Sequence, residues 1–197
     1  MLKKLSLMTV CAVSVFALHN VELNINDKDL EIGAKLDMGQ FNDYTEPNTV
    51  FVGVKFLHGN EDHSDIEKND IDDFSELNFL MQRDIDSSGL KLGLGVKLNH
   101  TESFTTIPLG IEASYKLPVG DVTPLYLGAS IYFAPEVLAM EDAKSFLEYR
   151  VNFDIEVIEN GRISLGYRSI DTNYEIKGET YNMNYNRSAH IGFKFAF

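Results

Sequence analysis

Cysteine is almost absent from this chain, which holds one, Cys11, among 197 residues. A disulfide framework and a Cys-based zinc site both need several thiols, so we expect neither. Basic residues are also scarce, because 17 Lys and Arg stand against 30 Asp and Glu, a formal net charge of −13. Such a chain lacks the positive surface that holds a phosphate backbone, and we expect no nucleic-acid partner.

Long apolar runs are missing too, apart from residues 5–18. That run is shorter than the roughly 17 to 25 residues that a membrane-spanning helix needs. It follows two lysines and has small residues, Val15 and Ala17, at the two positions that a signal peptidase reads, a pattern typical of a secretory signal peptide. We therefore predict a signal peptide over residues 1–17, cleaved after Ala17, and one domain over residues 18–197. Cys11 would be removed with the signal, so the exported chain would carry no thiol.

The rest of the chain alternates between apolar and polar residues with a period of two, which is typical of β-strands. The alternation is clearest over residues 90–99, 107–117 and 147–157. Weaker alternation predicts further strands at 21–26, 29–38, 49–58, 74–83, 124–133, 162–173 and 188–197. Segments of about ten residues are long enough to cross a bilayer at a tilt. We predict an all-β fold, an antiparallel transmembrane β-barrel of ten strands in an up-and-down meander, with eight strands as the alternative.

The connections between these strands are alternately long and short, as in outer-membrane barrels, which have long external loops and short periplasmic turns. The predicted external loops are residues 59–73, 100–106, 134–144 and 174–187, and the predicted periplasmic turns lie at 84–88, 118–123 and 159–161. In the last of these, Asn160-Gly161 predicts a type I′ turn. The first two strands break the rule, because the external turn at 27–28 is short and the periplasmic connection at 39–48 is long. This irregularity leaves eight strands open.

Alternation alone does not say which face meets water, since a lipocalin-like barrel is apolar inside and a membrane barrel is apolar outside. Aromatic residues near the predicted strand ends favour the membrane, where they form interfacial girdles. They are Phe51, Phe56, Tyr115, Phe133 and Tyr167. In a membrane barrel Leu94 would meet lipid and its neighbour Gly95 the lumen, so arginine is expected to cost far more at Leu94.

The last eight residues resemble the C-terminal assembly signal of bacterial outer-membrane barrels. Gly192, Phe195 and Phe197 occupy the glycine and aromatic positions of that signal. The resemblance implies a location in the cell outer membrane, with the barrel assembly machinery, outer-membrane lipid and lipopolysaccharide as partners.

Several short segments resemble the YfaZ-type family of bacterial outer-membrane proteins. They are Tyr-Phe-Ala-Pro-Glu-Val-Leu at 132–138, Phe-Leu-Glu-Tyr at 146–149, Gly-Arg at 161–162 and Gly-Tyr-Arg at 166–168. The likeness covers the C-terminal half well and the N-terminal half only in pattern. It implies a small outer-membrane barrel whose physiological role is not established, so it carries over no catalytic residue.

The polar face of the predicted strands carries charges of both signs. Because an unpaired buried charge is costly, we expect these groups to pair in a closed or very narrow lumen. The predicted network comprises Lys91, Lys97, Glu112, Lys116, Glu148, Arg150, Asp154, Arg162, Arg168 and Lys194. The favoured function is therefore structural or interactive, and a narrow channel for ions or small solutes is the alternative.

We predict no enzyme, catalytic residue, metal or cofactor. His100, Glu102 and Ser103 lie together in one predicted external loop, which leaves a lipid-modifying enzyme of the outer leaflet as a further alternative. The acidic segment 59–73 has oxygen ligands at the spacing of a calcium-binding EF-hand. It has Asp70 where that loop needs glycine, so we expect no ordered calcium site.

Overall fold

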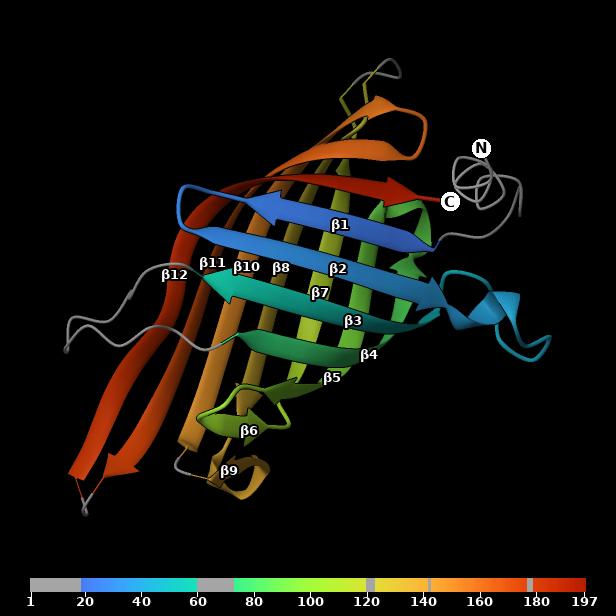
Figure 1. Ribbon diagram of the computed structural model, residues 1–197. Coiled ribbons are helices and arrows are strands. Elements are labelled where there is room, and N and C mark those ends of the chain that lie inside the picture. The colour runs from blue at the N-terminus through green and yellow to red at the C-terminus, as the bar shows by residue number, and fades with distance from the viewer. Residues whose placement is uncertain (1–18, 60–72, 120–122, 142, 177–178) are drawn as a thin grey trace, which may run out of the picture.

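The computed structural model describes residues 19–59, 73–119, 123–141, 143–176 and 179–197. These residues form a closed, antiparallel β-barrel (Figure 1). No helix in this part of the chain is long and apolar enough to cross a membrane. The predicted signal peptide and most of the acidic segment 59–73 lie outside the described residues and stay predictions.

Ten strands of the described chain form the barrel wall, each antiparallel to the next. They are β1 (Asn20–Ile25), β2 (Asp29–Asp37), β3 (Val50–Gly59), β4 (Phe74–Ile85), β5 (Leu90–His100), β7 (Leu109–Leu117), β8 (Leu125–Ala134), β10 (Ala143–Ile158), β11 (Gly161–Ile176) and β12 (Glu179–Ala196). The ring closes where β1 pairs with β12, from Asn20 opposite Ala196 to Ile25 opposite Ile191. The ten-stranded meander is thus confirmed and the eight-stranded alternative is wrong, since β1 and β2 belong to the wall.

The two ends of the barrel differ. The terminal end is where Asn20 and Ala196 meet, and there the strands are joined by turns and two short 3-10 helices, η3 (Met38–Gln40) and η4 (Asp86–Ser88). At the far end, two short strands, β6 (Phe104–Thr106) and β9 (Ala139–Glu141), pair with each other (Figure 1). A third 3-10 helix, η5 (Glu136–Leu138), leads into β9.

The outer wall is apolar and the interior is polar. On β5, Leu94 is 69% exposed on the outside, whereas Lys97 and Asn99 are buried inside. Leu, Ile, Val and Phe side chains are exposed in the same way around the wall, on strands from β1 to β12. This is the arrangement of a membrane barrel, and the lipocalin-like alternative, with its apolar face inside, is wrong.

The structure corrects three details of the sequence prediction. The described part of residues 174–187 is strand and not loop, because β11 runs to Ile176, β12 begins at Glu179, and both strands project beyond the rest of the wall (Figure 1). The turn after β10 is not centred on Asn160-Gly161, since Gly161 already belongs to β11 and only Asn160 has a positive φ, of 61°. Phe51 is not a girdle residue, because its side chain is 4% exposed inside the barrel.

An apolar cluster fills the far end of the lumen. Its buried members are Leu57, Phe74, Phe104, Ala134, Ala143, Phe146, Ile170, Tyr174 and Tyr185. The ring centroids of Phe104 and Phe146 are 6.1 Å apart, and those of Phe104 and Tyr185 are 5.7 Å apart, within the usual range for packed aromatic pairs. We call this set the aromatic plug. The short strand β6 contributes Phe104 to it, so the predicted loop 100–106 helps to close the barrel.

Candidate functional site

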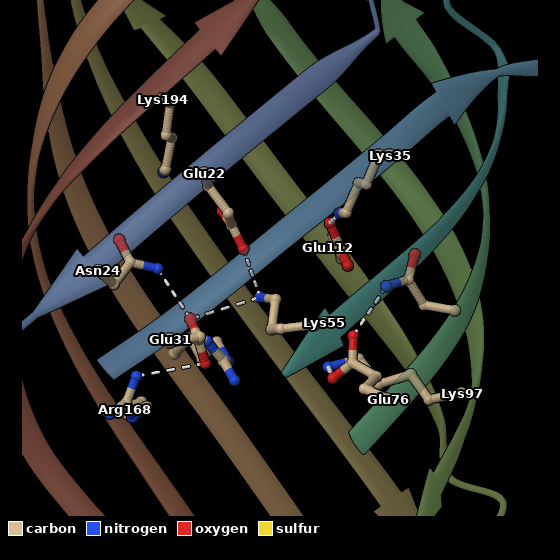
Figure 2. A network of polar contacts seen from close by, with 12 residues as sticks. Glu22, Asn24, Glu31, Lys35, Lys55, Glu76, Lys97, Glu112, Arg168 and Lys194 are labelled. Atoms are coloured by element: carbon tan, nitrogen blue, oxygen red, sulfur yellow. Dashed lines mark hydrogen bonds and ion pairs between the residues drawn. The ribbon is translucent and has the colours of Figure 1, made fainter. Parts of the chain in front are cut away.

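A network of buried charges crosses the lumen (Figure 2). Glu31 on β2 is its centre, with a side chain that is fully buried. The carboxylate of Glu31 lies 2.8 Å from Nη1 of Arg150, 3.2 Å from Nη1 of Arg168 and 3.7 Å from Nζ of Lys55. Because Arg150 and Arg168 belong to β10 and β11, these ion pairs join opposite sides of the barrel.

The network continues from Arg150 to the other wall. Nε of Arg150 donates to Glu148 at 2.5 Å, and the second carboxylate oxygen of Glu148 lies 2.8 Å from Nζ of Lys97 on β5. Lys97 also pairs with Glu76 of β4 at 2.9 Å. Lys97, Glu76 and Glu148 are all less than 5% exposed. Buried charges in such a chain are tolerable only because each has at least one opposite charge within contact distance.

Two further ion pairs lie nearer the terminal end of the lumen. Nζ of Lys194 lies 2.9 Å from Asp154, and Nζ of Lys35 lies 3.3 Å from Glu112. All four side chains line one cavity together with Lys91 and Arg162, which reach the terminal rim. There Lys91 pairs with Asp84 at 3.0 Å and Arg162 approaches Glu156 at 3.5 Å.

The structure therefore brings most of the predicted network into the lumen. Lys116 differs. It is exposed near the terminal end of β7, and it is not among the described residues that line the cavity. The sequence analysis also missed central members of the network: Glu22, Asp29, Glu31, Lys55 and Glu76. They lie on β1 to β4, where the alternation is weak, and their inward positions follow only from the register with the clearer strands.

Tyr132 of β8 connects the network to the wall. Its ring lies over Gly95 and Gly110, where an added Cβ would collide with it. Its hydroxyl donates to Glu112 at 2.7 Å, and Nζ of Lys97 lies 4.1 Å from the ring centroid, a cation–π contact. The glycines thus leave room for an aromatic ring to lie flat against the inner wall. The sequence predicted that Gly95 faces the lumen, but not that a neighbouring side chain fills that space.

The cavity has a volume of about 260 Å³ and lies between the charge network and the terminal end. Its lining runs from Arg150 and Lys97 at the network to Asn20 and Lys91 at the rim. The aromatic plug blocks the opposite side, where Phe74, Phe104 and Phe146 have no solvent-exposed surface. The lumen is therefore a polar vestibule with one blind end.

The remaining predicted features are not joined to this vestibule. Nδ1 of His100 contacts Oγ1 of Thr105 at 2.9 Å, and the same hydroxyl lies 3.4 Å from Glu141. His100 thus contacts a threonine on β6 rather than forming the histidine–serine pair that acyl transfer would need. No group of three or more potential metal ligands occurs among the described residues.

The residues of the predicted assembly signal lie along the seam between β1 and β12. Gly192 faces inward, and an added Cβ there would collide with the amide of Asn24. Phe197 exchanges two backbone hydrogen bonds with His19, of 2.9 and 3.0 Å, and its ring stacks on Phe195 at 6.3 Å. These contacts give the three residues a structural place at the seam; their role in assembly stays a prediction.

No profile of a known protein family matches the chain, and no curated protein sequence matches it. Among solved structures, the chain is similar to a KdgM porin, with 9% identity over 91% of this chain and 98% of that chain and a TM-score of 0.47. It is also similar to outer-membrane expressed OmpT of Vibrio cholerae (16% identity) and to the in-vitro folded trimer form of OmpT (15%), each with a TM-score of 0.35. The chain covers 56% of each OmpT chain, to which it aligns over 86% of its own length. Identities this low concern the fold alone.

Proposed function

We propose that the protein is an integral outer-membrane barrel with a structural or interaction role, not an enzyme, and that its lumen does not conduct. The observation that carries this proposal is the double closure of the lumen. Arg168, Glu31 and Glu148 are each at most 1% exposed in the charge network, and the aromatic plug lies beyond them. The apolar outer wall supports the membrane location, since lipid is the solvent that suits it.

In this proposal the terminal end faces the periplasm and the far end faces outward. Strands β10, β11 and β12 have 16, 16 and 18 residues, whereas the other wall strands have 6 to 12. Their extension would carry the β11–β12 hairpin into the lipopolysaccharide layer, where it would be available for contacts. Export by a cleaved signal peptide and membership of the YfaZ-type family remain predictions beside this proposal.

Purified protein is expected to give no stepwise conductance in a planar lipid bilayer at moderate salt. The physical reason is that an ion would have to displace paired charges and then cross an apolar plug. The same preparation unfolded by boiling serves as the control for detergent artefacts. Reproducible ohmic steps that scale with salt concentration would instead support the narrow channel and contradict a closed lumen.

Replacing Phe197 by Ser is expected to lower the amount of protein in the outer-membrane fraction severalfold. Phe197 packs on Phe195 and contacts His19 at the seam, and the sequence around it resembles an assembly signal. Thr123→Ser, in an exposed turn at the same end of the barrel, is the matched control. Immunoblots of fractionated cells give the measurement. Equal levels of both variants would argue against the signal, and recovery of the unaltered protein in the soluble periplasm would contradict the membrane location.

A further inference from the structure

The lining of the vestibule is unusually rich in positive charge for such an acidic protein. It contains seven cationic side chains: Lys35, Lys55, Lys91, Lys97, Arg150, Arg162 and Lys194. It contains four carboxylates: Glu22, Glu76, Glu112 and Asp154. The carboxylates of Glu31 and Glu148, which balance Arg150 and Lys97, are fully buried behind the lining. Two further carboxylates, Asp84 and Glu156, lie outside the lining and pair with Lys91 and Arg162. Every lining cation thus has a partner, but the lining itself holds more cationic than anionic side chains, although the whole chain has a net charge of −13.

One cationic donor at the floor of the vestibule is left over from the network. Arg150 uses Nη1 for Glu31 and Nε for Glu148, and its buried Nη2 has no hydrogen-bond partner among the described residues. An unused donor on a buried guanidinium is costly unless an acceptor reaches it. Arg150 belongs to the lining of the vestibule, so a small movement of its side chain would bring Nη2 to an acceptor held there.

The cations nearer the rim also keep hydrogen-bonding capacity. Lys35 and Lys194 are 26% and 25% exposed, and each pairs with one carboxylate, Glu112 or Asp154. An ammonium group has three donors, so neither pair uses all of them. Positive groups along a narrow, low-dielectric wall concentrate anions in it.

We propose that the vestibule binds a small oxyanion, with a carboxylate or phosphate oxygen accepting a hydrogen bond from Nη2 of Arg150. Lys35 and Lys194 attract the anion at the approach. Because the aromatic plug blocks the far end, the anion enters and leaves at the terminal end. This site is independent of whether the barrel has any interaction role outside the lumen.

Ser130 offers a position for a test, because it lies between Glu112 and Arg150 in the strand register and lines the vestibule. Ser130→Cys, in the otherwise cysteine-free chain of residues 18–197, is reacted in detergent micelles with anionic and cationic methanethiosulfonate reagents of similar size. We expect the anionic reagent to react at least about tenfold faster, relative to the same ratio at the exposed control Thr123→Cys. Equal rates, or a preference for the cationic reagent, would overturn the proposal.

Competition identifies the anion. Inorganic phosphate or acetate is expected to slow the reaction at Ser130→Cys saturably, whereas chloride at the same ionic strength is not. Inhibition by phosphate alone assigns the site to phosphate oxygens, and inhibition by acetate alone assigns it to carboxylates. Inhibition by neither, or by chloride equally, would mean that only general screening is at work and would overturn a specific site.

Two variants in the Ser130→Cys background separate binding from general charge. Lys35→Gln removes one lining cation from a partly exposed pair and is expected to reduce the preference for the anionic reagent severalfold. Arg150→Lys keeps the charge but removes Nη2, so it is expected to keep most of that preference and to lose the competition by phosphate or acetate. If Arg150→Lys does not fold, as judged by gel mobility before and after boiling, the Lys35→Gln result decides. A preference unchanged in Lys35→Gln would contradict the proposal.

Discussion

Replacing Glu31 by Gln is expected to destabilise the barrel by about 3–5 kcal/mol, the usual cost of leaving a buried charge without its partner. Glu31 is fully buried and contacts Arg150, Arg168 and Lys55, and it accepts a hydrogen bond of 2.8 Å from Asn24. The neutral amide keeps the shape of the side chain but leaves these three cations short of one negative charge. Urea-induced unfolding of the protein in lipid vesicles, followed by gel mobility or tyrosine fluorescence, measures the loss.

An exposed ion pair provides the matched control. Asp84 and Lys91 are 3.0 Å apart at the terminal rim, and their side chains are 63% and 41% exposed. Water and salt screen such a pair, so Asp84→Asn is expected to change stability by about 0–1 kcal/mol. If Glu31→Gln had an effect as small as that of Asp84→Asn, the buried network would not be holding the barrel together across the lumen.

The second large effect is expected on the outer wall, where Leu94→Arg should destabilise the barrel by about 2–4 kcal/mol. Leu94 is 69% exposed on the outside of β5 and lies near the middle of that strand, which runs from Leu90 to His100. In a membrane that position lies in hydrocarbon, where a guanidinium loses its hydration. Unfolding in vesicles is the measurement, because a detergent micelle would hide part of the cost.

The control for Leu94→Arg must place the same side chain inside the barrel. Gly95 is unsuitable, although it faces the lumen, because Tyr132 occupies the space above it. Gln82 is better, since it lines the vestibule near the terminal end. Its amide donates a hydrogen bond of 3.1 Å to the carbonyl oxygen of Asn48, and a guanidinium group can donate in the same way. Gln82→Arg is expected to cost about 1 kcal/mol or less, as for other substitutions at hydrated surface positions. Equal losses for both variants would contradict a lipid-facing outer wall.

The sequence by itself determined the class of fold and the division of the clearest strands into one apolar and one polar face. The period of two on β5, β7 and β10 is a local property, because every residue of a strand turns its side chain opposite to the last. Leu94 and Lys97 could therefore be assigned to opposite faces without knowing any partner strand. The same local signal was too weak on β1 and β2 to exclude eight strands. It also could not reveal that β11 and β12 extend into the polar segment 174–187, which the sequence predicted to be a loop.

Only the tertiary structure decided how the lumen is filled. Glu31 meets Arg150 from a strand 119 residues away, and that contact depends on the closure and stagger of the whole barrel. The aromatic plug likewise combines Phe74, Phe104 and Phe146 from three separate strands. Inward-facing polar residues are visible in a sequence, but which of them pair, and where they leave a vestibule, depends on register between strands that are distant in the chain. That is the physical reason why the sequence predicted a polar interior but could not show its blind end or its surplus of cations.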